Sequence, residues 1–292
     1  MFAATEDTED AGNAEDAAMQ PGGKHDGLTG TEEEVSVDIR NHVGIIEMRK
    51  PPHNFLTPGL VEAVASALEA LDGDLGVRAV VLAAEGRSFC AGANFSAEPG
   101  DSEGIVEQDG GLSPARRLYA AAYRMFSVSI PVVAAVHGPA VGGGLGLAMV
   151  ANLRVTCPEA RFSANFVRLG IHQGFGLSVT LPELLGPSKA ALMLLTGRRF
   201  NGEEATKLGL ADACVPREQV RQAAVDLASE IAEGAPLALR AVNSTLRAGL
   251  AEKVREATNY EILEQEKLLA TEDALEGIIA VMARRPGNFK GR

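Results

Sequence analysis

Two short aliphatic runs constrain the fold of this chain more than any other feature of its sequence. Residues 78–84 (RAVVLAA) and 131–136 (PVVAAV) lack the polar alternation of a half-exposed strand, and such runs are typical of strands buried on both faces. An apolar face at helical spacing follows Thr57, a residue type that caps helices, and another helical pattern lies near 115–128. Buried strands interleaved with amphipathic helices predict an α/β core.

The flanking patterns indicate where this core begins and ends. Residues 35–40 alternate apolar and polar side chains, and residues 43–48 form an apolar segment after a short turn, which predicts a β-hairpin. Towards the C-terminus helical patterns dominate, with leucine and isoleucine at helical spacing over 253–283. We therefore predict a folded core at residues 35–235 and a C-terminal helical module at 236–292.

Most of the negative charge lies before the core. Residues 1–34 hold ten acidic residues against Lys24, a net charge of −9 out of −12 for the 292-residue chain. The stretch is rich in Ala, Gly and Thr and has no apolar periodicity. A segment of this composition buries too little apolar surface to fold alone. We predict an acidic, disordered tail at residues 1–34.

Composition also excludes several classes of protein. An acidic chain repels nucleic acid, whose binding depends on clustered Lys and Arg. No apolar run approaches the roughly 18–20 residues that span a bilayer, and the first residues lack the pattern of a signal peptide. The three scattered cysteines, Cys90, Cys157 and Cys214, fit neither a disulfide framework nor a zinc site. We therefore expect a cytoplasmic protein that binds no metal, no nucleic acid and no membrane.

Two segments of small residues follow the two buried runs. They are residues 89–95 (FCAGANF) and 142–146 (GGGLG). Small residues permit close approach to the backbone, and a helix that begins there presents unpaired N–H groups. If the segments lie side by side, one N–H from each can hold a single oxygen, as in an oxyanion hole worth about 3–4 kcal/mol per donor. The alternative is that each is only a tight turn or a close packing contact.

Several ordered motifs resemble the crotonase superfamily, the enoyl-CoA hydratases and isomerases. The matching pieces are residues 43–48 with 51–54, 79–82 with 89–95, 130–138 with 142–144, 162–170, 195–198 with 205–210, and 288–291. The resemblance implies a crotonase-like spiral of ββα units with a C-terminal helical trimerisation region. It also implies an acyl-CoA substrate, no cofactor other than the coenzyme A of that substrate, and a homotrimer or hexamer.

The resemblance further assigns site residues by motif position. The N–H groups of Ala93 and Gly143 would form the oxyanion hole for a thioester enolate. The coenzyme A contacts would involve seven residues, of which the last two usually reach across from a neighbouring subunit: His53, Asn54, Phe55, Ala91, Asn94, Phe289 and Lys290.

The acid residues of the family pattern are missing from this chain. Gly146 and Phe166 stand where hydratases carry their two glutamates, and Gly174 stands where related enzymes carry an aspartate. Neither glycine nor phenylalanine transfers a proton. His172 is one candidate acid/base, since its ordinary pKa near 6.5 suits proton transfer, although it fits a surface turn equally well.

The other candidate acids are Glu98, Asp101 and Glu103, which lie on a predicted surface loop at 96–114. The reaction therefore stays open between isomerisation, thioester hydrolysis and C–C cleavage. The rival hypothesis is a catalytically inactive acyl-CoA-binding protein, with a purely structural scaffold as a more distant one.

Overall fold

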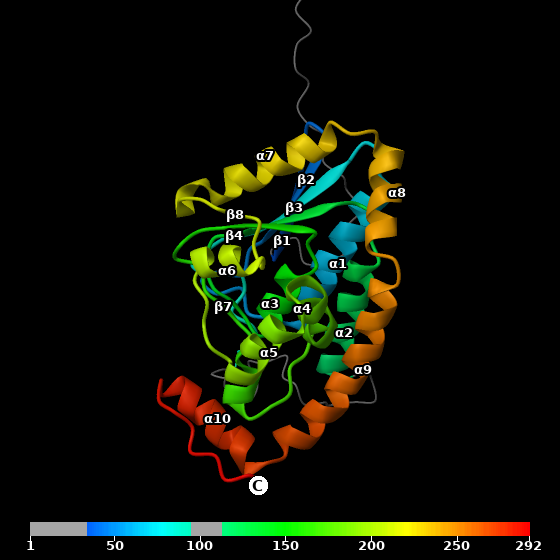
Figure 1. Cartoon of the computed structure of the whole chain (residues 1–292). Helices are drawn as coiled ribbons and strands as arrows, with labels where there is room; N and C mark the ends of the chain where they lie inside the picture. Colours follow the sequence, from blue (N-terminus) through cyan, green and yellow to red (C-terminus); the bar gives the residue numbers. More distant parts are fainter. Residues whose placement is uncertain (1–33, 95–112) are drawn as a thin grey trace, which may run out of the picture.

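A six-stranded sheet organises the residues that the computed structural model describes, 34–94 and 113–292 (Figure 1). Its strand order is β1-β2-β3-β4-β6-β8; β1 and β2 are antiparallel, and the other neighbours are parallel. The strands are β1 Val35–Arg40, β2 Val43–Met48, β3 Ala79–Ala84, β4 Val132–Val136, β6 Leu153–Thr156 and β8 Ala213–Cys214. A separate parallel pair consists of β5 Ala140–Val141 and β7 Phe162–Ser163.

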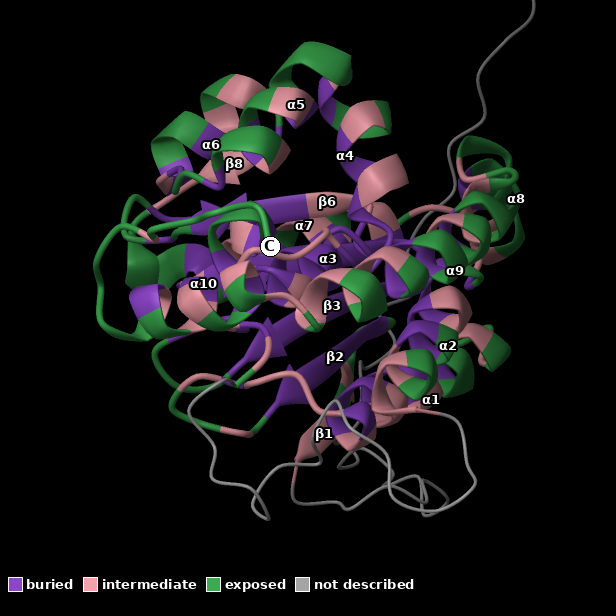
Figure 2. Ribbon diagram, turned by 90° about the horizontal axis from the view of Figure 1, so that it is seen from below, coloured by how far each residue is buried: buried purple, intermediate pink, exposed green. Residues whose placement is uncertain are grey.

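The sequence predictions for the strands are confirmed. The hairpin turn is formed by Asn41 and His42, both at positive φ (47° and 68°), the backbone that tight hairpin turns need. Strands β2, β3 and β4 are buried along their whole length, as the absence of polar alternation in the two aliphatic runs predicts. Figure 2 shows β2 and β3 in the colour of buried residues.

Helices follow the strands in a repeated strand–strand–helix order. The helices up to residue 232 are α1 Pro58–Gly73, α2 Pro114–Phe126, α3 Gly143–Ala148, η1 Asn165–Leu169, α4 Leu177–Leu185, α5 Pro187–Thr196, α6 Gly202–Leu208, η2 Arg217–Gln219 and α7 Val220–Ala232. The order β1-β2-α1, β4-β5-α3 and β6-β7-η1 is that of successive ββα units. The predicted Thr57 cap is present, because its side chain accepts a hydrogen bond from the Leu60 N–H.

Three more helices complete the chain: α8 Pro236–Leu246, α9 Leu250–Leu269 and α10 Glu272–Met282. The helical pattern at 253–283 therefore belongs to two helices, and Thr271 caps the second by accepting from Ala274 N. Figure 1 shows α8 and α9 running along one side of the molecule and α10 crossing its lower end. The division at 235/236 and the use of this region in trimer contacts stay predictions.

The C-terminal helices are attached to the core by partly buried polar contacts. Arg240 of α8 pairs with Asp72 at the end of α1, and Asp72 also accepts from the N–H groups of Ser129 and Ile130. Helix α9 lies against α2 and α4, and α10 lies against η1. These contacts bring α9 and α10 beside the segments that follow β3 and β4.

Two further findings bear on the expectations from composition. Within the described ranges, no helix is long and apolar enough to cross a membrane. All three cysteines are free thiols, with Cys90 and Cys157 buried. Residues 1–33 and 95–112, which include almost all of the predicted tail and Glu98, Asp101 and Glu103, lie outside the described residues.

Candidate active site

The two segments of small residues lie side by side. Cys90 forms a parallel bridge with Ala140, and the Cys90 carbonyl accepts a hydrogen bond of 3.1 Å from the Val141 N–H. Gly92 has a φ of +81°, and a methyl group there would lie 2.5 Å from the Val141 carbonyl oxygen and 3.7 Å from the Gly143 nitrogen. A methyl group on Gly144 would collide with the Cys90 carbonyl. The glycines are therefore required by the close approach of two backbones.

This approach brings Ala93 and Gly143 to one place. Gly143 is the first residue of α3, so its N–H has no acceptor within the helix. No backbone hydrogen bond to another described residue involves the N–H of Ala93 or of Gly143. Both residues line the same cavity of about 340 Å³. Two N–H donors on one cavity wall, neither with a backbone acceptor among the described residues, are the arrangement that binds an oxyanion.

The cavity is mainly apolar and draws its walls from distant parts of the chain. Leu56 and Ala91 line it near the two N–H groups, and Leu118 and Tyr119 of α2 line another side. Gln265 and Leu269 of α9 and Val281 of α10 also line it. The C-terminal helices thus form part of the cavity wall within this same chain. No carboxylate is found among the described lining residues.

Aromatic side chains fill the space at the missing acid positions. Phe166 itself lines the cavity. A Cβ on Gly146 would lie 2.5 Å from Cβ and 2.7 Å from Cγ of Phe175, a buried residue at a φ of +60°. A Cβ on Gly174 would collide with the Tyr119 hydroxyl. At Gly146 and Gly174, where the resemblance places acids, the structure therefore leaves no room for a side chain.

Tyr119 brings a hydroxyl group to this part of the cavity. Its hydroxyl donates to Gln265 Oε1 at 3.0 Å, and its ring meets the Phe175 ring edge-on, with centroids 6.4 Å apart. Burial, reinforced by the negative charge of Glu261, raises the pKa of Tyr119. The phenol therefore stays protonated at neutral pH and is a hydrogen-bond donor. No pattern in the sequence indicates this hydrogen bond.

A buried carboxylate that sequence reasoning missed lies behind this wall. Glu261 of α9 is fully buried and accepts hydrogen bonds from Gly176 N at 2.9 Å and Ser178 N at 3.1 Å. These N–H groups belong to the start of α4, so Glu261 caps that helix from another element. Burial raises the pKa of its carboxyl.

The pH dependence of stability, compared between wild type and Glu261→Gln, tests the effect of burial on the Glu261 carboxyl. Because the pKa is raised in the folded state, folded protein holds the proton when the unfolded chain has released it. The contribution of this bound proton to the free energy of unfolding is complete below the ordinary pKa of a carboxyl group. It is lost as pH rises through the raised pKa of Glu261 in the folded protein. The free energy of unfolding is measured with urea at several pH values across this range, at one protein concentration. It is expected to fall more with rising pH for wild type than for Glu261→Gln. Parallel curves would show that Glu261 titrates as it does in the unfolded chain.

The two histidines proposed from the sequence lie outside the described cavity lining. His172 Nδ1 lies 2.8 Å from the Gln173 carbonyl oxygen, and its ring meets Tyr260 edge-on. The His172 carbonyl accepts from Gln265 Nε2 at 3.0 Å, so this residue contacts the Tyr119–Gln265 pair through its backbone. His53 Nδ1 lies 3.0 Å from Ser88 Oγ, and its ring is 5.6 Å from that of Phe55.

The remaining residues assigned by motif have different surroundings. The Asn54 side chain is fully buried, donating to the carbonyls of Glu85 and Ser88 and accepting from Lys50 N. It therefore fixes the loop that carries His53 and Phe55. Asn94 is exposed at the end of the described segment. Phe289 and Lys290 are exposed beside α10, where Asp273 accepts the Lys290 N–H. No cluster of three or more potential metal ligands occurs among the described residues.

Comparison with known proteins decides the family. A sequence model of the enoyl-CoA hydratase/isomerase family matches residues 38–292. The chain belongs to this family. It is 30% identical over 261 residues to a probable enoyl-CoA hydratase of Bacillus subtilis, covering 88% of this chain and 98% of that one. It is 34% identical over 252 residues to a putative enoyl-CoA hydratase of Thermus thermophilus, covering 86% and 98%.

Solved structures share the fold. The enoyl-CoA hydratase/isomerase of Pseudoalteromonas atlantica superimposes with a TM-score of 0.77 at 26% identity, covering 88% of this chain and all of that one. OdaA of Pseudomonas aeruginosa superimposes with a TM-score of 0.73 at 30% identity, covering 86% and 99%. The α/β fold and the crotonase resemblance predicted from the sequence are thereby confirmed.

Proposed function

We propose that this chain is an enzyme that binds an acyl-CoA thioester and stabilises its enolate with the N–H groups of Ala93 and Gly143. One observation carries the proposal: these donors come from two separate segments, lack other backbone acceptors among described residues, and line one cavity. Backbone donors are preorganised and do not titrate, so they suit charge that develops on a thioester oxygen.

The reaction that best suits the groups present is cleavage of a C–C bond at the α-carbon. Hydration by a pair of glutamates needs carboxylates where this chain has Gly146 and Phe166. When a carboxylate leaves the α-carbon as CO₂, the broken bond's electron pair forms the enolate, and no base is required. The step then needs only a proton donor for the α-carbon, and the Tyr119 phenol supplies it and regains a proton from solvent. Arg199, which lines the cavity without a described ion pair, favours an anionic substrate.

Replacing Tyr119 with phenylalanine is expected to lower kcat by about 10²-fold, the lower end of the effect of general acids, with a smaller change in KM. The substitution removes one hydroxyl and keeps the packed ring. Tyr123→Phe is the matched control on the same helix, because that hydroxyl bonds Glu252 Oε1 and the residue lies outside the described cavity lining. Equal kcat values for the two variants would show that Tyr119 does not donate the proton to the α-carbon.

A panel of acyl-CoA substrates tests the reaction directly. The full-length protein is incubated with 2-enoyl-, 3-enoyl-, saturated and α-carboxyl acyl-CoAs, and products are identified by mass. We expect release of CO₂ from an α-carboxyl substrate. Hydration or isomerisation of an enoyl-CoA would assign the chemistry to a carboxylate outside the described cavity lining. Tight binding with no product from any member would favour the rival, an inactive acyl-CoA-binding protein, which the missing glutamates also support.

Coenzyme A contacts and assembly complete the proposal. The coenzyme would run past Ala91, Asn94 and the loop of His53, Asn54 and Phe55, and Phe289 and Lys290 would approach it from a neighbouring subunit. We expect a homotrimer or hexamer, measurable by light scattering. Large apolar side chains are exposed on α8 and α10, which favours burial against another copy: Leu237, Val242, Leu246, Leu275, Ile279 and Met282.

A further inference from the structure

The side chain of Asn165 lies in the wall of the candidate active site without a hydrogen-bond partner among the described residues. Asn165 is the first residue of η1 and lines the cavity together with Gly142 and Gly143. It is half-buried, and neither the oxygen nor the nitrogen of its carboxamide is sealed from solvent. The amide therefore offers two N–H donors and one acceptor oxygen to a ligand.

This carboxamide lies beside the candidate oxyanion hole. Asn165 Oδ1 is 3.4 Å from the position that a Cβ on Gly142 would take, and Gly142 directly precedes the donor Gly143. The Gly142 N–H donates to the Ser163 carbonyl at 2.8 Å, so the segments that carry Gly143 and Asn165 are joined. Because the amide oxygen and nitrogen exchange places when the carboxamide turns over, its N–H groups reach the same position.

A neighbouring segment holds the backbone of Asn165 in place. Phe162 and Phe200 exchange two backbone hydrogen bonds of 2.9 Å, and Ser163 Oγ donates to the Gly197 carbonyl at 3.2 Å. Gly197 has a φ of +55°, and a Cβ there would lie 3.3 Å from Asn165 Cα. A side chain on a backbone fixed in this way binds a ligand with little loss of conformational freedom.

The other polar side chains of the described lining are bonded to one another or exposed. Tyr119 donates to Gln265, and Gln265 donates to the His172 carbonyl. Arg199 is exposed and has no ion pair with a described residue, so its charge attracts an anion towards the cavity. Of the described lining residues, Asn165 therefore supplies the neutral donor beside the candidate oxyanion hole.

We propose that Asn165 determines specificity for an acyl-CoA with a carboxylate on its α-carbon, by donating a hydrogen bond to that carboxylate. The inference rests on the proposed function, in which the N–H groups of Ala93 and Gly143 hold the thioester oxygen. Substituents of the α-carbon lie close to that oxygen, unlike groups further along the acyl chain. A neutral amide binds a carboxylate less strongly than a bidentate guanidinium does. Asn165 therefore orients the carboxylate without preventing its departure.

Binding of two unreactive thioesters to the full-length protein tests this role by calorimetric titration. The probes are α-sulfopropionyl-CoA and isobutyryl-CoA, which differ by a sulfonate and a methyl group on the α-carbon. The sulfonate takes the place of the carboxylate and cannot leave as CO₂. Asn165→Leu is expected to weaken binding of α-sulfopropionyl-CoA about tenfold, as loss of a hydrogen bond to a charged group does. The affinity for isobutyryl-CoA is expected to stay the same.

A second substitution and a control keep the test independent of folding. Asn165→Asp retains the size of the side chain and replaces the donor with a negative charge, so it is expected to weaken binding of α-sulfopropionyl-CoA more than Asn165→Leu does. Gln222→Leu is the matched control, because it removes a carboxamide from an exposed position on α7 outside the described lining. This control is expected to change neither affinity.

The outcomes separate this inference from the proposed function. If wild type binds both thioesters and Asn165→Leu changes both affinities equally, or neither, Asn165 does not recognise the α-substituent, while the proposed binding of acyl-CoA stands. If wild type binds neither thioester, the proposed function is wrong and the role of Asn165 is overturned with it. A loss confined to α-sulfopropionyl-CoA supports both.

Discussion

Replacing Gly143 with proline is expected to lower kcat/KM by about 10²–10³-fold relative to Gly143→Ala, the effect of losing one oxyanion-hole donor. Proline removes the N–H, and it is well tolerated at the first position of a helix, where Gly143 lies. Both substitutions place a Cβ against the end of the flexible Leu56 side chain. The difference between the two variants therefore measures the N–H and not the added bulk. Turnover is measured with whichever acyl-CoA the substrate panel identifies.

Circular dichroism and thermal unfolding of both Gly143 variants establish that each is folded. If Gly143→Pro and Gly143→Ala have the same kcat/KM, the Gly143 N–H does not stabilise the transition state. Gly144→Ala gives an internal comparison, because its methyl group would collide with the backbone carbonyl of Cys90. Backbone yields less readily than a side-chain tip, so this variant is expected to lose more stability than Gly143→Ala.

Replacing Phe175 with alanine is expected to lower the free energy of unfolding by about 3–5 kcal/mol, the usual effect of emptying a buried aromatic site. The ring is fully buried, fills the space beside Gly146 and contacts Tyr119 edge-on. The measurement is urea unfolding at one protein concentration, with the midpoint compared at an unchanged slope.

Phe175→Leu is the graded control, because it retains much of the buried volume and is expected to destabilise less than Phe175→Ala. The alanine variant removes the ring but keeps the Cβ, which would still lie 2.5 Å from a Cβ at position 146. A destabilisation below about 1 kcal/mol, typical of an exposed position, would contradict the claim that Phe175 occupies this space.

The sequence alone predicted those features that depend on local pattern. Strands β3 and β4 follow from aliphatic runs, the β1–β2 turn from its position between two apolar segments, and the α1 cap from Thr57. Small residues after the buried strands permit the close approach of the segments at 89–95 and 142–146, but the sequence left open whether they lie side by side. The expected helix directly after Cys90 is absent from residues 91–94, which form neither helix nor strand.

The walls of the site were less predictable because they are made by residues far apart in the sequence. In the sequence, Gly146 and Gly174 stand where the resemblance places acidic residues. Only the fold shows that Phe175 and Tyr119 occupy the space beside these two positions. The positive φ of Phe175 has no signal in its residue type. Glu261 looks like an ordinary helical glutamate, yet it is buried and caps α4 from α9.

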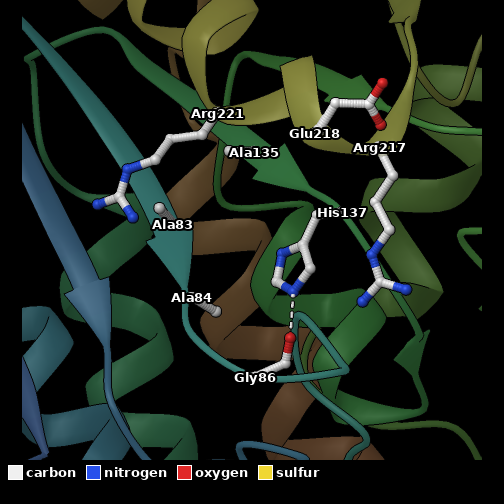
Figure 3. Close-up of a pocket in the computed structure, with 8 residues that line it drawn as sticks. All are labelled: Ala83, Ala84, Gly86, Ala135, His137, Arg217, Glu218 and Arg221. Carbon is white, nitrogen blue, oxygen red and sulfur yellow. Dashed lines mark hydrogen bonds between the residues drawn. The ribbon is translucent and has the colours of Figure 1, made fainter.

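A cavity at the carboxyl ends of β3 and β4 illustrates the same limit (Figure 3). His137 follows β4, whereas Arg217 begins a short helix much later in the chain, and neither residue alone indicates a ligand. Their juxtaposition depends on α7 packing across β3 and β4. Patterns of hydrophobicity specify which elements form, but which side chains share a cavity depends on tertiary packing.

The carbonyl stretching frequency of a bound acyl-CoA tests the central claim most directly. An acyl-CoA labelled with ¹³C at the thioester carbonyl is bound to the full-length protein and observed by difference infrared spectroscopy. Two N–H donors polarise the carbonyl, so its band is expected at lower frequency than in water for wild type and Gly143→Ala, with a smaller shift for Gly143→Pro. A bound carbonyl with the same frequency as in water would contradict the assignment of Ala93 and Gly143 as the oxyanion hole.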